Sequence, residues 1–203
     1  MADQMLALRA WSDETRPDLV EDDLARRPLA ICVSGGGFRS FSCVMGELRA
    51  LHGLGLLDHS GLLSGVSGGA WATAAYAYAP GELADRLGDV PSPDALTLDA
   101  LTQVIDENHL AHPITQMDAM TYARALQEQE VQPSRFFSRI LGDQLLKPLG
   151  VDVGRRFLAG GPDHFADLAA RNPQLAADDV LMPIAGRVPV VTGATMMVRG
   201  AEK

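Results

Sequence analysis

The chain has 203 residues, of which 47% are hydrophobic and 21% charged, and its formal net charge is −9 at pH 7. These values are typical of one globular domain that can bury a core. The acidic balance excludes a nucleic-acid binder, because phosphate contacts need a concentrated basic surface that 17 scattered Lys and Arg residues do not supply. No apolar run reaches the roughly 18 residues of a membrane-spanning helix, so we expect any membrane contact to be peripheral.

Residues 1–27 are mixed and rich in acidic side chains, and we expect them to form an N-terminal extension. They lack the basic segment and apolar stretch of an export signal, which predicts a cytoplasmic chain. Cys32 and Cys43 fall on an expected strand and on the helix after it, where small thiols usually pack into the core. We expect neither a disulfide nor a structural metal from them. The oligomeric state is left open.

Two strand-turn-helix units follow one another along the chain. The apolar run at residues 28–33 is typical of a buried strand; a glycine turn at 34–37 and a helical pattern ending near residue 52 come after it. The order repeats with a strand at 62–66 and a helix at 68–76. Successive units of this kind predict an α/β fold with a mainly parallel sheet, in which ligands bind at the carboxyl ends of the strands.

The pattern changes after residue 80 to helical segments separated by prolines. Apolar periodicity at 96–105 and 136–149 predicts helices, so we expect residues 81–187 to form a mainly helical cap or insertion. An apolar run at 188–193 predicts a further strand. The whole chain, residues 1–203, is therefore interpreted as a single domain.

A serine lies at the turn of the second unit, flanked by glycines. Gly65, Ser67 and Gly69 fit the G-x-S-x-G nucleophile elbow, in which a sharp strand-to-helix turn exposes a serine hydroxyl. Gly68 completes the turn. The backbones approach closely in such an elbow, so we expect a Cβ at Gly65 or Gly69 to clash. Ser67 is the candidate nucleophile.

The glycine turn of the first unit is the candidate oxyanion hole. Gly35, Gly36 and Gly37 allow successive N–H groups to point the same way, and the helix that follows adds a positive dipole. A plain turn and the phosphate cradle of a nucleotide-binding module are the alternatives. Arg39 follows the turn, where its guanidinium could bind a phosphate or form a surface ion pair.

Residues 34–71, with the sequence SGGGFRSFSCVMGELRALHGLGLLDHSGLLSGVSGGAW, resemble the catalytic core of cytosolic phospholipase A2 and its lysophospholipase relatives in the patatin-like superfamily. The two motifs, their order, their separation and the Trp after the elbow agree. The resemblance implies a three-layer α/β/α core with a helical cap. It also implies that Ser67 is the nucleophile, Gly36 and Gly37 the oxyanion donors and Arg39 the cation that faces the substrate phosphate.

The resemblance further implies a serine-aspartate dyad that hydrolyses a phospholipid or lysophospholipid without a cofactor or metal. The family's Asp usually precedes a glycine, and no Asp-Gly pair occurs in this sequence, so we expect a domain truncated before that residue. Substitute bases are available among later carboxylates: Asp143, Asp152, Asp178 and Asp179. We also expect the apolar face of the later helix to contact lipid through Phe136, Phe137, Leu141, Leu145 and Leu146.

Two alternatives to an active enzyme of this family stay open. An inactive fragment or lipid-binding remnant would account for the missing Asp-Gly pair. An esterase of the α/β-hydrolase kind would need a histidine after Ser67, for which His109, His112 and His164 are the candidates.

Overall fold

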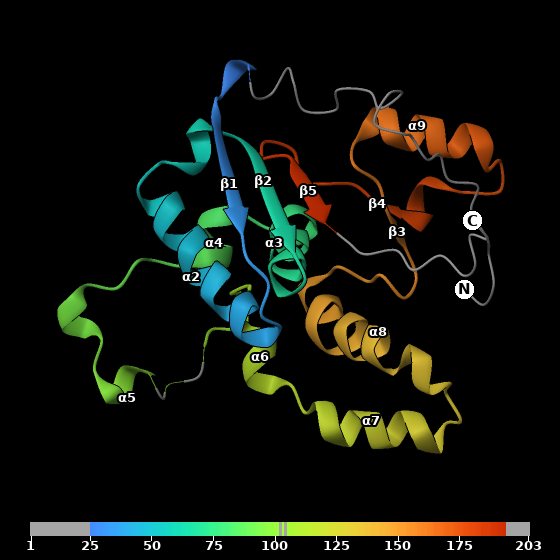
Figure 1. The fold of residues 1–203 in the computed structure, drawn as a ribbon, viewed down its shortest axis with the longest axis horizontal. Helices are drawn as coiled ribbons and strands as arrows, with labels where there is room; N and C mark the ends of the chain where they lie inside the picture. The colour runs from blue at the N-terminus through green and yellow to red at the C-terminus, as the bar shows by residue number, and fades with distance from the viewer. Residues whose placement is uncertain (1–24, 102, 104, 194–203) are drawn as a thin grey trace, which may run out of the picture.

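The computed structural model describes residues 25–101, 103 and 105–193. Its main sheet has the strand order β1 (Leu29–Val33), β2 (Ser60–Val66) and β5 (Val190–Gly193), and both pairs of neighbours are parallel (Figure 1). The predicted α/β fold with a parallel sheet is confirmed. Most of the N-terminal extension expected at residues 1–27 lies outside the described residues.

The two predicted strand-turn-helix units are present. Helix α2 (Phe38–Gly53) follows β1, and helix α3 (Gly68–Tyr78) follows β2. The two helices pack on each other, and α3 also packs on β2. Fully buried Phe41 and Leu48 of α2 join Leu63 of β2 in the main core. Both turns therefore lie at the carboxyl end of the sheet.

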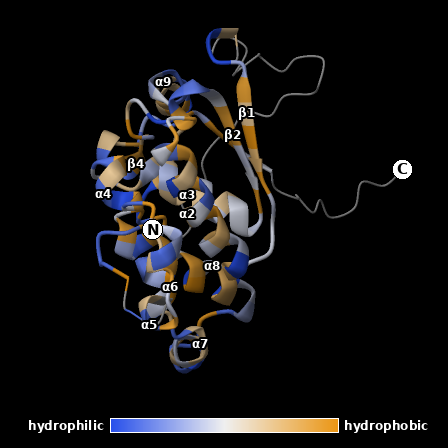
Figure 2. Cartoon of the chain, turned by 90° about the vertical axis from the view of Figure 1, so that its left-hand side faces the viewer, coloured by the Kyte–Doolittle hydropathy of each residue, from blue (hydrophilic) through white to orange (hydrophobic). Residues whose placement is uncertain are grey.

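The helices of the described residues lie on one side of the main sheet (Figure 2). The second helical layer of the expected three-layer core is not among the described residues. Val66 and Val191 on the opposite face are 49% and 44% exposed.

Cys32 and Cys43 are exposed free thiols, so the expectation that they pack into the core was wrong. Successive side chains of a strand point to opposite faces of the sheet. Cys32 lies between the inward-facing Ile31 and Val33, so its side chain is on the open face.

The described part of region 81–187 is largely helical, with one short pair of parallel strands. The helix predicted at 96–105 was too long: among the described residues of that range one helical turn forms, at Leu98–Leu101, and Leu98 is 77% exposed. The helical run predicted at 136–149 forms as α8 (Phe136–Ile140), a π-helical segment (Leu141–Leu146) and a 3₁₀ turn (Lys147–Leu149). The other elements are α4 (Leu83–Leu87), α5 (Leu98–Leu101), α6 (His112–Gln116), α7 (Ala119–Glu128), α8 (Phe136–Ile140), β3 (Phe157–Leu158), α9 (Pro162–Arg171) and β4 (Val180–Leu181).

Arg187 joins the end of α3 to the segment that leads into β5. Its guanidinium donates to the carbonyl oxygens of Tyr76, Ala79 and Gly81, the last two at 2.7 Å. The Tyr76 hydroxyl accepts from the N–H of Val188 at 3.0 Å, and burial raises the pKa of that hydroxyl. These contacts fix the far end of α3, the helix whose N-cap is Ser67.

Among the described residues, no helix has the length and apolar character to cross a membrane.

Candidate active site

Ser67 lies between the last residue of β2 and the first residue of α3 in a strained backbone conformation. Its φ is 53° and its ψ is −124°. Positive φ is uncommon for a residue with a Cβ, and it persists only where the surrounding structure imposes it. The side chain is exposed, and the Ser67 carbonyl accepts from the N–H of Trp71 at 3.2 Å, which closes the first turn of α3. The chain thus lifts a serine hydroxyl out of a sharp strand-to-helix turn.

The glycines around Ser67 are required by close backbone contacts. A Cβ at Gly65 would lie 2.8 Å from the carbonyl carbon and oxygen of Gly69, and one at Gly69 would lie 2.7 Å from the Ser34 oxygen. Both clashes expected from the sequence are confirmed. The tightest position is Gly68, whose added Cβ would lie 2.1 Å from the Gly37 oxygen. The glycine turn and the serine turn are therefore in direct contact.

The glycine turn faces Ser67 from the start of α2. A Cβ at Gly35 would lie 3.0 Å from the Ser67 Cβ and 3.6 Å from its Oγ. Gly36 and Gly37 have φ values of 150° and 66°, and Gly37 is the N-cap of α2. Within the described part of the chain, no carbonyl accepts a hydrogen bond from the N–H of Gly36 or Gly37. Two N–H donors at a helix N-terminus thus lie beside the serine turn.

Ser40 holds the glycine turn and was not singled out from the sequence. Its Oγ donates to the Ser34 carbonyl oxygen at 2.5 Å and so ties the first turn of α2 to the residue before the glycines. A serine three residues after a helix N-cap is a weak signal, because many serines occupy such positions. The contact fixes both ends of the glycine turn.

We expect Ser40→Ala to lower the free energy of unfolding by about 1 kcal/mol, the usual net value of one hydrogen bond. Chemical denaturation measures this change. Ser42→Ala is the matched control, because the Ser42 hydroxyl donates to the Phe38 carbonyl oxygen within the same helix. Equal losses in the two variants would contradict the structural role of Ser40.

Ser67 opens into a largely apolar pocket of about 910 Å³. The sequence did not indicate its walls, which come from β2, α3, the π-helical segment, β3 and β5. The side chain of Tyr78 is fixed by donation from its hydroxyl to the Ala159 carbonyl oxygen at 2.9 Å, and burial raises the pKa of that hydroxyl. The lining residues are Val66, Ser67, Ala70, Trp71, Ala74, Tyr78, Leu146, Leu158, Val190, Thr192 and Gly193.

Arg39 is exposed and lines a different, smaller pocket of about 290 Å³. That pocket also contains Gly35, Gly36, Cys43 and Glu47. The structure therefore brings Arg39 to the glycine turn but not into the pocket of Ser67.

The carboxylates considered as substitute bases lie elsewhere. Asp143 accepts from the Tyr122 hydroxyl at 2.5 Å and pairs with Arg139 at 3.3 Å. Asp152 lines the same separate pocket as Asp143. Asp178 is exposed in a 3₁₀ turn, and a side-chain oxygen of its neighbour Asp179 accepts from a backbone N–H of that turn at 2.9 Å. No carboxylate of the described residues lines the Ser67 pocket.

The histidines also lie away from Ser67. His109 packs against Gly88, a ring nitrogen of His112 lies 2.7 Å from the Ile105 oxygen, and His164 accepts from the N–H of Gly160. An α/β-hydrolase triad would need one of these rings beside the serine.

Within the described ranges, no group of three or more His, Cys, Asp or Glu side chains could hold a metal ion.

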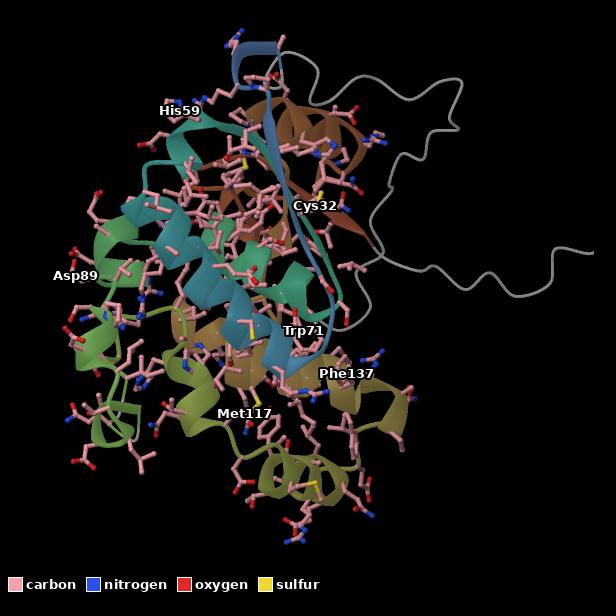
Figure 3. All side chains as sticks on the ribbon, turned by 60° about the vertical axis from the view of Figure 1, so that its left-hand side comes forward. Cys32, His59, Trp71, Asp89, Met117 and Phe137 are labelled. Atoms are coloured by element: carbon pink, nitrogen blue, oxygen red, sulfur yellow. The ribbon has the colours of Figure 1, made fainter. Side chains whose placement is uncertain are left out.

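The apolar face expected to contact lipid is mostly used inside the protein. Leu145 is fully buried, Leu146 is 9% exposed and Leu141 packs against the main core. Phe137 differs, since it is 59% exposed. Its ring points to Trp71, with 5.7 Å between the ring centroids (Figure 3). The expectation for Leu145 was wrong, because the π-helical segment turns it into the core. Leu146 also turns inward, but it lines the Ser67 pocket.

These features define an α/β protein in which a parallel sheet presents a serine on a strained turn, with a glycine turn packed against it. A family model described as "Lysophospholipase catalytic domain" matches residues 29–138, more than half of the chain. The chain belongs to this family.

Two human proteins are similar to part of the chain. Cytosolic phospholipase A2 beta is 42% identical over 57 residues, which are 28% of this chain and 7% of that protein. Cytosolic phospholipase A2 delta is 41% identical over 69 residues, 34% of this chain and 8% of that protein. The matched segments thus span less than a tenth of either relative. No solved structure matches the chain.

Proposed function

We propose that this chain hydrolyses carboxylic esters of phospholipids or lysophospholipids through an acyl-Ser67 intermediate. The observation that carries the proposal is the strained turn at Ser67, packed directly against a glycine turn, in a domain of the lysophospholipase catalytic family. Backbone strain of this kind persists at functional sites because the geometry itself is needed there.

In this mechanism the Ser67 oxygen attacks the ester carbonyl carbon while a base takes the serine proton and later gives it to the leaving alcohol; the described residues supply no carboxylate in the pocket for this role. The N–H groups of Gly36 and Gly37 donate to the oxyanion, and the N-terminal end of α2 adds its positive dipole. The tetrahedral intermediate collapses, the alcohol leaves with a proton, and the acyl group stays on Ser67. Water then attacks the acyl-enzyme and releases the fatty acid.

The two pockets suggest how a lipid would lie. The apolar pocket at Ser67 suits an acyl chain, because its walls are mainly aliphatic and aromatic. Arg39 lines the smaller pocket together with Gly35 and Gly36, where its guanidinium can bind a phosphate that extends past the glycine turn. The names of the two relatives place those proteins in the cytosol. We extend that location to this chain, with peripheral contact to lipid.

A lipid-binding protein without turnover is the second candidate. It is favoured by one observation, namely that no carboxylate of the described residues lines the Ser67 pocket. The apolar pocket would then hold an acyl chain that is never cleaved.

Labelling of the folded wild-type chain with a fluorophosphonate probe distinguishes these functions. We expect a single adduct on Ser67, located by mass spectrometry, and release of fatty acid from lysophosphatidylcholine. Ser64 serves as an internal control, since it lies on the same strand but outside the pocket. A folded chain that forms no adduct would contradict the hydrolase function and favour the lipid-binding function.

A further inference from the structure

Three aromatic rings connect the two turns of the candidate site to helix α8. Phe38 directly follows the glycine turn, and its ring centroid lies 5.4 Å from that of Trp71. Trp71 lies one helical turn after Ser67 and lines its pocket. Phe137 packs on Trp71 in an edge-on arrangement at 5.7 Å (Figure 3). The rings therefore form a continuous row from α8 to the residue beside Gly37.

The position of the glycine turn relative to Ser67 depends on the distance between α2 and α3. The glycine contacts set a lower limit to this distance, because the Gly68 and Gly37 backbones already touch. Nothing in those contacts prevents the turn from moving away. The packing of α2 on α3 holds the helices together, and the Phe38–Trp71 contact adds a restraint at the end nearest the glycine turn, with Phe137 packed against Trp71 in turn.

Helix α8 is also joined to the pocket by its continuation. The π-helical segment that follows it contributes Leu146 to the pocket wall. π-Helical turns frequently occur at functional sites, where they redirect side chains. The helical run at 136–149 thus contacts the site at two places: Phe137 packs on Trp71, and Leu146 lines the pocket.

We infer that Phe137 is a positioning residue: by supporting Trp71 it holds Phe38, and with it the glycine turn, in register with Ser67. Helix α8 therefore controls the placement of the oxyanion donors. This inference rests on the function proposed above. The exposure of Phe137 fits such a role, because a ring that is 59% exposed contributes little to the core.

The test is the concentration dependence of fluorophosphonate labelling in the full chain. We expect Phe137→Ala to lower the maximal labelling rate about tenfold, because small displacements of catalytic groups act on the transition state. The half-saturating probe concentration should change by less than about twofold, since ground-state binding is retained. Phe137→Tyr keeps the ring and should restore the rate. Leu98→Ala is the control, an exposed apolar residue on α5.

Tryptophan fluorescence gives a readout that is independent of labelling. The chain has two tryptophans, so Trp11→Phe leaves Trp71 as the sole tryptophan, which is excited selectively at wavelengths where tyrosine does not absorb. In that background, Phe137→Ala should shift the emission to longer wavelength, because the indole loses its aromatic cover. An unlabelled wild type would overturn the proposed function and this inference with it. Equal labelling of wild type and Phe137→Ala, or a loss that Phe137→Tyr does not restore, would overturn the inference alone.

Discussion

Replacing Gly68 with alanine is expected to lower the rate of Ser67 labelling by a fluorophosphonate at least about a hundredfold, the loss caused by removing one oxyanion donor. The added Cβ would lie 2.1 Å from the Gly37 oxygen and 2.8 Å from its nitrogen and carbonyl carbon. These atoms are backbone and cannot rotate away as a flexible side chain would. The glycine turn must therefore move off the serine turn, and its N–H groups move with it.

Gly46→Ala is the matched control for this substitution. Gly46 lies within α2, and an added Cβ there would meet no atom within 4 Å. Alanine at an open helical position stabilises a protein by about 0.5–1 kcal/mol relative to glycine. Gly35→Ala should give an intermediate loss of labelling, because its Cβ would approach the Ser67 Cβ only to 3.0 Å. Full labelling of folded Gly68→Ala would show that the two turns do not act together.

The two turns could be predicted from the sequence because their signals are local. The apolar runs and glycines before α2 and α3 fix each strand-turn-helix unit within a few residues. Glycine at residues 65 and 69 also carries three-dimensional information, since close backbone contact excludes a Cβ. The parallel sheet follows from the repeated unit, because parallel strands need a crossover connection.

Packing partners far apart in the sequence could not be predicted in the same way. The walls of the Ser67 pocket at Leu158 and Val190 depend on the path of the chain through region 81–187. The periodicity of 136–149 indicated a helix but not the π-helical segment. The side chain of Leu145 was therefore expected on the surface, whereas it is buried. Arg39 follows the glycines in the sequence, but the pocket that its side chain lines depends on the rotation of α2, which the sequence does not give.

Arg187→Ala is expected to lower the free energy of unfolding by about 3 kcal/mol, because three carbonyl oxygens lose a charged donor at once. Two of these oxygens, from Tyr76 and Ala79, lie at the C-terminal end of α3, where a cation also stabilises the helix dipole. Burial lowers the pKa of the Arg187 guanidinium, and this desolvation offsets part of the gain. For a chain of this size the melting temperature should fall by about 6–12 °C.

Arg155→Ala separates this effect from the loss of positive charge. Its side chain is 83% exposed and lies 4.0 Å from Asp152, so the substitution should change the free energy of unfolding by less than about 1 kcal/mol. Arg187→Lys should lose most of the stability that Arg187→Ala loses, because one ammonium group lacks the planar fork that reaches several carbonyls. Similar melting temperatures for Arg155→Ala and Arg187→Ala would contradict the assignment. A selective loss at Arg187 would show that the helix beginning at Ser67 is anchored at its far end, where Arg187 joins it to the segment leading into β5 and the pocket wall at Val190.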